Sequence, residues 1–513
     1  MRNSSRRTVL AGVATALVSP SIRAQDATRQ KIAAALPRIE ALARQIIDRK
    51  LVPGLSIAVV HQDEAVYLQA FGVRQVGMPA LVDVDTVFQL ASVSKPIAST
   101  VLSALVSEGK VSWESRLRDI DPGFALNDEL ATAALTVGDL FAHRSGLPGH
   151  VGDDIEDLGF SQGDILRRLR LAKPAYSFRN GYSYSNFGLT QGAVAAARFA
   201  GMSWEEAAEE KLYKPLGMKS TSSRYRDFMG SSNRAALHVP VDGSWASFTR
   251  RDADAQSPAG GASSNARDMA QWLRLLLADG RFGGRQLIDK AALQAAHVPA
   301  ILRGIDPVTG AASFYGFGWN VDYREHGVEL SHAGAFSAGA RTLVHLIPGE
   351  QVGVVILSNA FPTGVPEGIA RTFFDLVFKG DPTRDWVALA NGIFDAGYKD
   401  MMKPSLAYET LSIAPAAALP ASAYAGDYGN DYVGNAKVVE TDGTLALHLG
   451  PAGKRFALTH FNRDVFVYNP MPEAPKARTG VSFLIGPNGR AVEVTIEDLN
   501  AYGMGRLTRL DGK

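Results

Sequence analysis

Ser92 and Lys95 form a Ser-x-x-Lys spacing that could support nucleophilic chemistry. Residues i and i+3 share one face of a helix, so the serine hydroxyl and the lysine amine can come within hydrogen-bond reach. A lysine can take the serine proton only if burial or nearby positive charge lowers its pKa. Free NH groups at a helix start can also polarise a substrate carbonyl. The spacing alone is weak, because Ser107-Glu108-Gly109-Lys110 repeats it where we expect a helix end and a turn.

Two further short motifs could supply partners for Ser92. Tyr184-Ser185-Asn186 lies in a polar loop before a helical stretch, where a tyrosine can relay a proton and an asparagine can hold Lys95 and a substrate carbonyl. His332-Ala333-Gly334 follows an apolar segment, and its histidine could donate to the tyrosine oxygen or to a substrate carboxylate. Each motif alone is weak: Tyr428-Gly429-Asn430 repeats the first, and an isolated histidine is more often an ordinary core residue.

The composition excludes several other kinds of site. The 513 residues include no cysteine, so a thiol nucleophile, a disulfide framework and a Cys-ligated metal are excluded. No phosphate-loop, dinucleotide or zinc-protease signature occurs, and the 10 histidines lack metal-ligand spacing, so we expect no cofactor and no metal. A formal net charge of +1 without a long basic run argues against nucleic acid. We expect a small-molecule or short-peptide substrate.

The order of the three motifs resembles the serine β-lactamase and penicillin-binding protein superfamily. The similarity is greatest to its class C-like branch, which holds class C β-lactamases, DD-carboxypeptidases, D-aminopeptidases and family VIII esterases. It covers roughly residues 45–380. Beyond the motifs it rests on residues 135–148 (LTVGDLFAHRSGLP), 214–218 (KPLGM), 258–261 (PAGG) and 315–319 (YGFGW).

The resemblance implies acyl transfer to water through a serine. Ser92 would be the acylated nucleophile, and Lys95 and Tyr184 would form the proton-transfer pair. Because the titrations of Lys95 and Tyr184 are coupled, the sequence leaves open which of them is the base. The NH groups of Ser92 and Ala335 would form the oxyanion hole. The substrate-binding positions would be Asn186, His332, Gly334 and Ala335.

The third motif departs from the class C β-lactamases, which typically have Lys-Thr-Gly there. A histidine at position 332 is more similar to the DD-peptidases and D-aminopeptidases, and it would hold a carboxylate less firmly than a lysine. We therefore expect hydrolysis of amide bonds in small peptides or amides first, β-lactam hydrolysis second and ester hydrolysis third. The alternative that is not an enzyme is a penicillin-binding sensor or scaffold that acylates slowly or not at all.

The elements that must position these residues fit an α/β (α+β) domain over residues 25–380. The resemblance implies a β-lactamase/transpeptidase-like fold, with a mainly antiparallel sheet flanked by helices and a helical lobe. Apolar periodicity predicts helices over 28–50, 97–106, 192–200, 204–213, 269–277 and 369–378. Short apolar runs beside turn residues predict strands over 55–60, 65–71, 87–90, 316–321, 343–347 and 352–357.

The remaining chain is predicted to hold a linker and a second domain. Residues 381–420 are predicted to be a connector, helical to about residue 409 and then rich in Ala and Pro. Paired strand signals around Asp442-Gly443 and Pro487-Asn488-Gly489 predict a C-terminal all-β domain over 421–513, either a barrel or a sandwich. No catalytic motif lies there, so we expect a structural or access-limiting role. The sequence does not define an oligomeric state.

The N-terminus has the pattern of a removable export signal. Residues 1–24 combine Arg6-Arg7, an apolar stretch from Val9 to Val18 and a processing point after Ala24. The paired arginines are similar to a twin-arginine signal, so we expect export, to the periplasm; the alternative is a short basic tail. No later run reaches the ~18 apolar residues of a membrane-spanning helix, and we expect no transmembrane segment.

Overall fold

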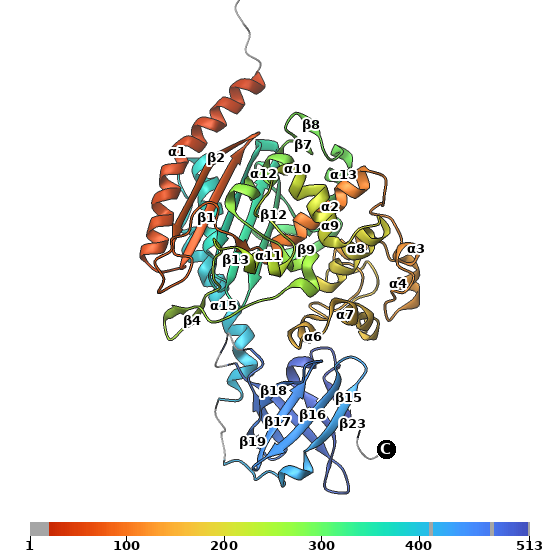
Figure 1. Cartoon of the computed structure of the whole chain (residues 1–513). Coiled ribbons are helices and arrows are strands. Elements are labelled where there is room, and N and C mark those ends of the chain that lie inside the picture. The colour runs from red at the N-terminus through yellow and green to blue at the C-terminus, as the bar shows by residue number, and fades with distance from the viewer. Residues whose placement is uncertain (1–19, 410–413, 472–473, 475–476, 511–513) are drawn as a thin grey trace, which may run out of the picture.

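An eight-stranded antiparallel sheet forms the centre of the first domain (Figure 1). We analysed a computed structural model, which describes residues 20–409, 414–471, 474 and 477–510. The strands lie in the order β2 (Glu64–Gly72), β1 (Gly54–His61), β14 (Val352–Ser358), β13 (Ala340–Ile347), β12 (Gly327–Phe336), β11 (Asn320–Arg324), β10 (Ala312–Tyr315) and β9 (Ile301–Ile305). The strands predicted over 55–60 and 65–71 are confirmed as β1 and β2, which pair as an antiparallel hairpin, and β1 also pairs with β14.

Alternating side chains of the central strands enter two different hydrophobic layers. In β1, Leu55, Ile57 and Val59 pack with helices α1 (Pro20–Asp48) and α14 (Val365–Lys379). The intervening Ala58 and Val60 belong to the core that contains α2 (Ser94–Ser107) and α12 (Ala266–Leu277). Successive side chains of a strand point to opposite faces, so apolar residues at every position produce a sheet covered on both sides.

A helical lobe lies beside the sheet and packs on α2 (Figure 1). Its helices are α3 (Leu117–Ile120), α4 (Glu129–Ala134), α5 (Val137–Phe141), α6 (Asp153–Asp157), α7 (Gln162–Arg168), α8 (Asn186–Phe199), α9 (Trp204–Ala208), α10 (Lys214–Leu216) and α11 (Tyr225–Gly230), and α13 (Lys290–Gln294) follows α12. Single turns of 3₁₀ or π type are η1 (Ala91–Val93), η2 (Leu169–Leu171), η3 (Glu209–Tyr213), η4 (Asp254–Gln256), η5 (Ser257–Gly261), η6 (Ala295–His297) and η7 (Pro348–Glu350). Two-stranded ribbons pair β3 (Phe88–Gln89) with β6 (Ser263–Ser264), β4 (Val239–Val241) with β5 (Ser244–Ala246), and β7 (Arg281–Phe282) with β8 (Arg285–Gln286).

The strand predicted over 316–321 is wrong in its first part. Residues 316–319 form a turn between β10 and β11, and extended pairing resumes only at Asn320. Gly318 has a φ of +83°, and a Cβ there would lie 2.9 Å from the carbonyl oxygen of Lys95. The glycines therefore serve a tight turn against the start of α2 instead of a pleated strand.

The C-terminal domain is one nine-stranded antiparallel sheet that curls into a nearly closed barrel. Of the two predicted architectures, the structure thus has the barrel. The order is β18 (Lys454–Ala457), β17 (Thr444–Leu449), β16 (Gly434–Thr441), β15 (Gly426–Asn430), β23 (Arg506–Arg509), β22 (Ala491–Ile496), β21 (Thr479–Ile485), β20 (Val465–Tyr468) and β19 (Thr459–Asn462), with turns η8 (Ala421–Ala423) and η9 (Glu497–Leu499).

Much of the segment between the two domains is helix α15 (Trp386–Leu406). This helix packs on α14, where a Cβ on Gly368 would lie 2.6 Å from the Cα of Val387. Figure 1 shows α15 running from the first domain toward the β domain. No helix among the described residues is long and apolar enough to cross a bilayer. The apolar stretch of the predicted signal lies outside the described residues, and α1 begins at Pro20.

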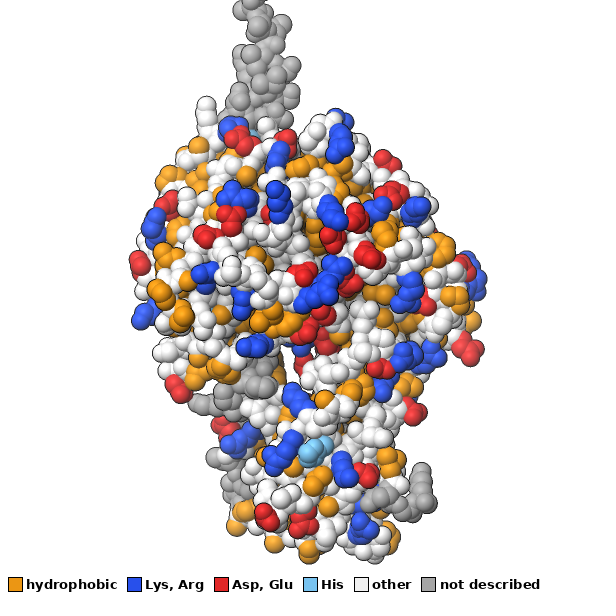
Figure 2. All heavy atoms as spheres, in the orientation of Figure 1, with side chains coloured by type: hydrophobic (Ala, Val, Ile, Leu, Met, Phe, Trp, Pro, Cys, Tyr) orange, Lys and Arg blue, Asp and Glu red, His pale blue; other side chains and the backbone are white. Residues whose placement is uncertain are grey.

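The molecular surface mixes charges of both signs. On the face in Figure 2, acidic and basic side chains alternate over the first domain, and a hollow separates it from the β domain. This distribution provides no basic stripe of the kind that binds a phosphate backbone on this face.

Candidate active site

Ser92 lies in a tight turn at the entrance to α2. The ribbon strand β3 leads into η1, and α2 begins at Ser94. Ala91 is held at a φ of +47°, a conformation that costs energy for a residue with a side chain. The Ser94 hydroxyl donates to the Ala91 carbonyl over 2.7 Å and stabilises this turn. Ser92 is therefore presented, half-buried, just before the helix whose first turn carries Lys95.

The Lys95 amine is fully buried and makes three hydrogen bonds. Its Nζ lies 3.0 Å from Ser92 Oγ, 2.6 Å from Asn186 Oδ1 and 2.9 Å from the carbonyl oxygen of Ala259 in η5. Burial lowers the pKa of Lys95 to about 7, while the carboxylate of Asp153 acts in the opposite direction. The structure thus brings the predicted Ser-x-x-Lys pair together and places a titrating amine beside the hydroxyl.

Tyr184 approaches Ser92 from the loop before α8. Its hydroxyl donates to Ser92 Oγ over 2.7 Å, and its ring lies 4.5 Å from Lys95 Nζ. Burial raises the pKa of Tyr184, so the phenol keeps its proton in the resting site. The Tyr184 ring also packs against the buried His143 in a tilted arrangement, with 4.6 Å between ring centroids.

Two arginines bind one buried carboxylate, and one of them, Arg179, attaches the Tyr184 loop to the segment that contains His143. Arg144 and Arg179 both donate to the fully buried carboxylate of Asp139, at distances of 2.7 to 2.8 Å. Thr136 completes a capping box with Asp139 at the start of α5. Burial acts to raise the pKa of Asp139, but these hydrogen bonds outweigh it and lower the pKa. The ion pair of Arg179 with Asp139 therefore connects two segments that are 40 residues apart in sequence.

Asn186 is held between Lys95 and Asp153. Its Nδ2 donates to Asp153 Oδ2 over 2.8 Å, which leaves Oδ1 facing Lys95 Nζ. His150 also contacts Asp153 Oδ2, at 2.9 Å. An amide has one donor end and one acceptor end, so the carboxylate fixes which end faces the lysine. Asp153 is a site residue that the motifs did not indicate.

His332 lies in β12 with its ring centroid 6.4 Å from that of Tyr184, but both its ring nitrogens bond to other residues. Its Nδ1 donates to the Ala333 carbonyl over 2.8 Å, so its Nε2 accepts from the Tyr315 hydroxyl over 2.9 Å. Burial, and next the charge of Lys95, lower the pKa of His332 to about 3. The ring is thus neutral and enclosed. We expected it to donate a hydrogen bond to Tyr184 or to a substrate carboxylate, and this expectation is wrong because both ring nitrogens already have partners.

Gly334 allows β12 to pass close to the nucleophile. A Cβ at this position would lie 3.0 Å from the Ser92 backbone nitrogen and 2.1 Å from the Leu90 carbonyl oxygen. Ala335, the next residue, is exposed at the mouth of the site. Any larger residue at position 334 would push the strand away from Ser92. Steric contact with the turn that holds Ser92 therefore explains why a glycine is present here.

A cavity of about 830 Å³ opens onto Ser92, and we call it the Ser92 cavity. Ala333 and Ala335 line it, whereas His332 and Gly334 do not. Its other lining residues include Tyr184, Asn186, Asp153, Glu156, Arg251 and, from the β domain, Lys454, Pro470 and Met471. Arg251 pairs with Glu156 and Asp157. Burial raises the pKa of Glu156 to about 7 although Arg251 opposes this.

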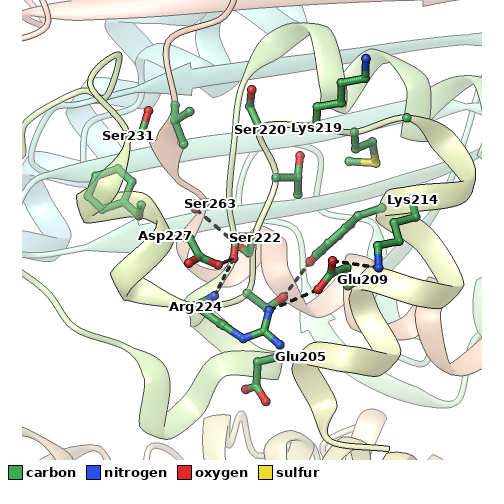
Figure 3. Close-up of a pocket in the computed structure, with 17 residues that line it drawn as sticks. Glu205, Glu209, Lys214, Lys219, Ser220, Ser222, Arg224, Asp227, Ser231 and Ser263 are labelled. Carbon is green, nitrogen blue, oxygen red and sulfur yellow. Dashed lines mark hydrogen bonds and ion pairs between the residues drawn. The ribbon is translucent and has the colours of Figure 1, made fainter.

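A second cavity, of about 620 Å³, lies between α9, α11 and β6 (Figure 3). Hydroxyls and charged side chains line it. Lys214 forms an ion pair with Glu209, and the Ser222 hydroxyl donates a hydrogen bond to Asp227. None of the predicted site residues lines it. Among the described residues, no three His, Asp or Glu side chains converge in a way that could hold a metal ion.

Comparison with known proteins agrees with the geometry around Ser92. The family model described as "Beta-lactamase" matches residues 39–376. The chain belongs to the beta-lactamase family. A second model, a domain of unknown function (DUF3471), matches residues 413–506. As a member of the beta-lactamase family, the protein is a serine hydrolase that works through an acyl-enzyme.

Individual relatives are distant. The chain is 27% identical to the unguisins hydrolase of Aspergillus campestris, over 75% of this chain and 74% of the relative. It is also 27% identical to penicillin-binding protein 4 of Amycolatopsis lactamdurans, over 64% and 84% of the two chains. The solved octameric penicillin-binding protein homologue from Pyrococcus abyssi aligns with a TM-score of 0.57 at 18% identity, over 92% of this chain and all of that one. This last similarity supports the fold alone.

Proposed function

We propose that the protein is an exported serine hydrolase that cleaves amide bonds of small peptides or amides through an acyl-enzyme on Ser92. One observation supports the chemistry above all. Ser92 Oγ lies within hydrogen-bond distance of both a fully buried lysine amine and a tyrosine hydroxyl. Serine is a poor nucleophile until a base removes its proton, and here two candidate proton carriers are already in place.

The pKa directions favour Lys95 as the base. A pKa of about 7 leaves a large fraction of Lys95 uncharged at neutral pH, so its amine can accept the Ser92 proton. Burial keeps Tyr184 protonated, so this phenol is suited to pass a proton to the leaving amine. Ser92 Oγ then bonds to the carbonyl carbon, the C–N bond breaks, and the amine leaves with the Tyr184 proton, which the Lys95 ammonium replaces. Water then hydrolyses the acyl ester, so the acid is released and Ser92 regains a proton. The NH groups of Ser92 and Ala335 would bind the oxyanion.

The charges around the cavity favour amines over carboxylates in the substrate. His332 is neutral and already bonded to Tyr315, so the third motif presents no cation to a carboxylate. Four acidic side chains line the cavity, Asp153, Glu156, Asp157 and Asp252, against three basic ones, Arg250, Arg251 and Lys454. Arg251 pairs with Glu156 and Asp157, so a small acidic excess remains, with Asp153 beside Asn186. Aminopeptidase-like substrates therefore suit the site better than the carboxylates of DD-carboxypeptidase substrates or of β-lactams.

A turnover panel tests this assignment. Purified protein is given D-amino-acid amides, a chromogenic cephalosporin and a short-chain ester, with Ser92→Ala as the control. We expect the highest kcat/KM on an amide and no turnover by the variant. Faster turnover of the cephalosporin or of the ester would contradict the proposed substrate class.

Export is supported by the signal-like pattern of residues 1–24. In a bacterial host with twin-arginine transport, the full chain should reach the periplasm, and replacement of Arg6 and Arg7 by Lys should retain it in the cytoplasm. Equal periplasmic amounts of both forms would contradict this route.

A further inference from the structure

The β domain makes direct hydrogen bonds to the start of one short active-site helix and packs against its end. Tyr432 lies between β15 and β16 and is buried against α6. Its hydroxyl accepts from the Gly152 backbone NH over 3.0 Å and donates to Asp154 Oδ1 over 2.7 Å. These two partners lie on either side of Asp153. Gly152 is the cap residue of α6 and has no side chain, so the Tyr432 hydroxyl supplies a partner at the helix start from another domain.

A second contact holds the other end of α6. The turn between β17 and β18 contains Gly450, which has a φ of +74°. A Cβ there would lie 2.2 Å from the carbonyl oxygen of Leu158, the residue after α6. The hairpin thus packs directly on the helix end. Lys454, a few residues later, lines the Ser92 cavity.

Helix α6 has only 5 residues, too few to keep a fixed position without tertiary contacts. It carries Asp153, which accepts from Asn186 Nδ2 and thereby turns Asn186 Oδ1 toward Lys95 Nζ. A continuous series of contacts therefore runs from Tyr432 through α6 and Asn186 to the lysine. Displacement of α6 would release the amide of Asn186 and move a carboxylate relative to Lys95.

We propose that the C-terminal β domain positions the catalytic lysine, by holding α6 through Tyr432 and Gly450 so that Asp153 orients Asn186. This gives the domain of unknown function a role in catalysis beyond structural support or limited access. The inference rests on the proposed function of Ser92 and Lys95. Tyr432 is a positioning residue, because it touches neither the reacting atoms nor the substrate carbonyl.

The electrostatic surroundings of Lys95 provide a readout for this role. The groups that face it are Asp153 on α6, Tyr184 before α8, His143 after α5 and His332 on β12. Burial lowers the pKa of both histidines and keeps them neutral, and it raises that of Tyr184. Asp153 is thus the charged neighbour, and it raises the pKa of Lys95. Loss of its charge should move the acid limb of the reaction to lower pH.

The test measures the rate at which a fluorescent alkylphosphonate labels Ser92 in the full chain, across pH. Tyr432→Phe should slow labelling about tenfold. It should also shift the acid limb in the same direction as Asp153→Asn. The matched control is Tyr424→Phe, whose hydroxyl hydrogen-bonds to Asp464 and the Leu419 NH within the described part of the chain, and it should label at the wild-type rate. A Tyr432→Phe rate and pH midpoint equal to those of the control would overturn the inference.

A glycine pair keeps the test decisive if Tyr432→Phe does not fold. Gly450→Ala and Gly443→Ala both place a Cβ at a left-handed hairpin position, but Gly443 has nothing within 4 Å of that atom. The backbone strain is therefore shared, and the difference between the variants reports the contact with α6. Slower labelling only in Gly450→Ala supports the inference, and equal rates contradict it. If wild-type Ser92 is not labelled at all, the proposed function fails first.

Discussion

Helix α2 has a Ser-x-x-Lys spacing at each end, and the two ends differ in every property that matters for chemistry. At the N-terminal end, Lys95 is fully buried and its amine contacts Ser92, Asn186 and η5. At the C-terminal end, Lys110 is exposed, and the hydroxyl of Ser107 accepts from the Asp289 backbone NH. Equal spacing thus produces a candidate catalytic pair in one place and a helix end in the other.

The difference shows that the rest of the chain creates the reactivity. Asn186 is 91 residues from Lys95 in sequence, and Ala259 is 164 residues away. These partners surround the amine, remove water and accept its hydrogen bonds. Burial then brings the pKa to about 7, where an amine can both take and return a proton. A solvated lysine has no such environment.

The largest expected effect comes from removal of the buried amine. Lys95→Ala should reduce kcat/KM about 10³- to 10⁴-fold, because Ser92 loses its base. Lys110→Ala should change kcat/KM less than about twofold, because it is a substitution on the exposed surface. Kinetics on the best amide substrate, with circular dichroism to verify folding, checks both. Comparable losses of kcat/KM in the two variants would contradict the claim that only the lysine at the N-terminal end of α2 takes part in catalysis.

The pH dependence should reflect the titration of Lys95. The amine must be uncharged to accept the Ser92 proton, so kcat/KM should fall about tenfold per pH unit below pH 7 and level off above it. A profile of kcat/KM between pH 5 and 9 measures this. A flat profile through pH 7, or one that falls as pH rises there, would contradict Lys95 as the base.

A smaller effect is expected at Asp139, which holds the Tyr184 loop. Asp139→Asn should lower the free energy of unfolding by about 3 kcal/mol, because Arg144 and Arg179 lose a buried carboxylate. The lowered pKa of Asp139 means that this stabilisation is present above the ordinary carboxyl pKa of 3.8 and declines as pH falls below it. Urea unfolding measures the change, with the exposed Asp119→Asn as the control. An equal free energy in both variants would contradict a structural role for Asp139.

The sequence predicted those parts of the site that short spacing and local structure determine. Ser92, Lys95, Tyr184 and Asn186 were all proposed from motifs, and the structure brings them together. His332 was also proposed from a motif, as a donor to Tyr184 or to a substrate. Its hydrogen-bond partner is instead Tyr315, and the motifs did not indicate this contact. Asp153 belongs to an acidic run that resembles a solvated helix face. Its contact with Asn186 exists only in the folded chain.

The fold follows the same division. Strands that are buried at every position, such as β1 and β14, were predicted well because burial on both faces leaves a nearly continuous apolar run. The turn over 316–319 was missed because its glycines and aromatics match a strand in composition, while their role is set by the approach of α2. The contact between Tyr432 and α6 joins two domains, so no local pattern could indicate it.

Mapping of the covalent adduct tests the central claim most directly. The folded protein is incubated with a fluorescent alkylphosphonate or a fluorescent penicillin, digested, and analysed by mass spectrometry. We predict one adduct, on Ser92, which is absent from Lys95→Ala and retained in Lys110→Ala. An adduct on Ser107 or on another serine, with Ser92 unmodified, would contradict the assignment of the nucleophile.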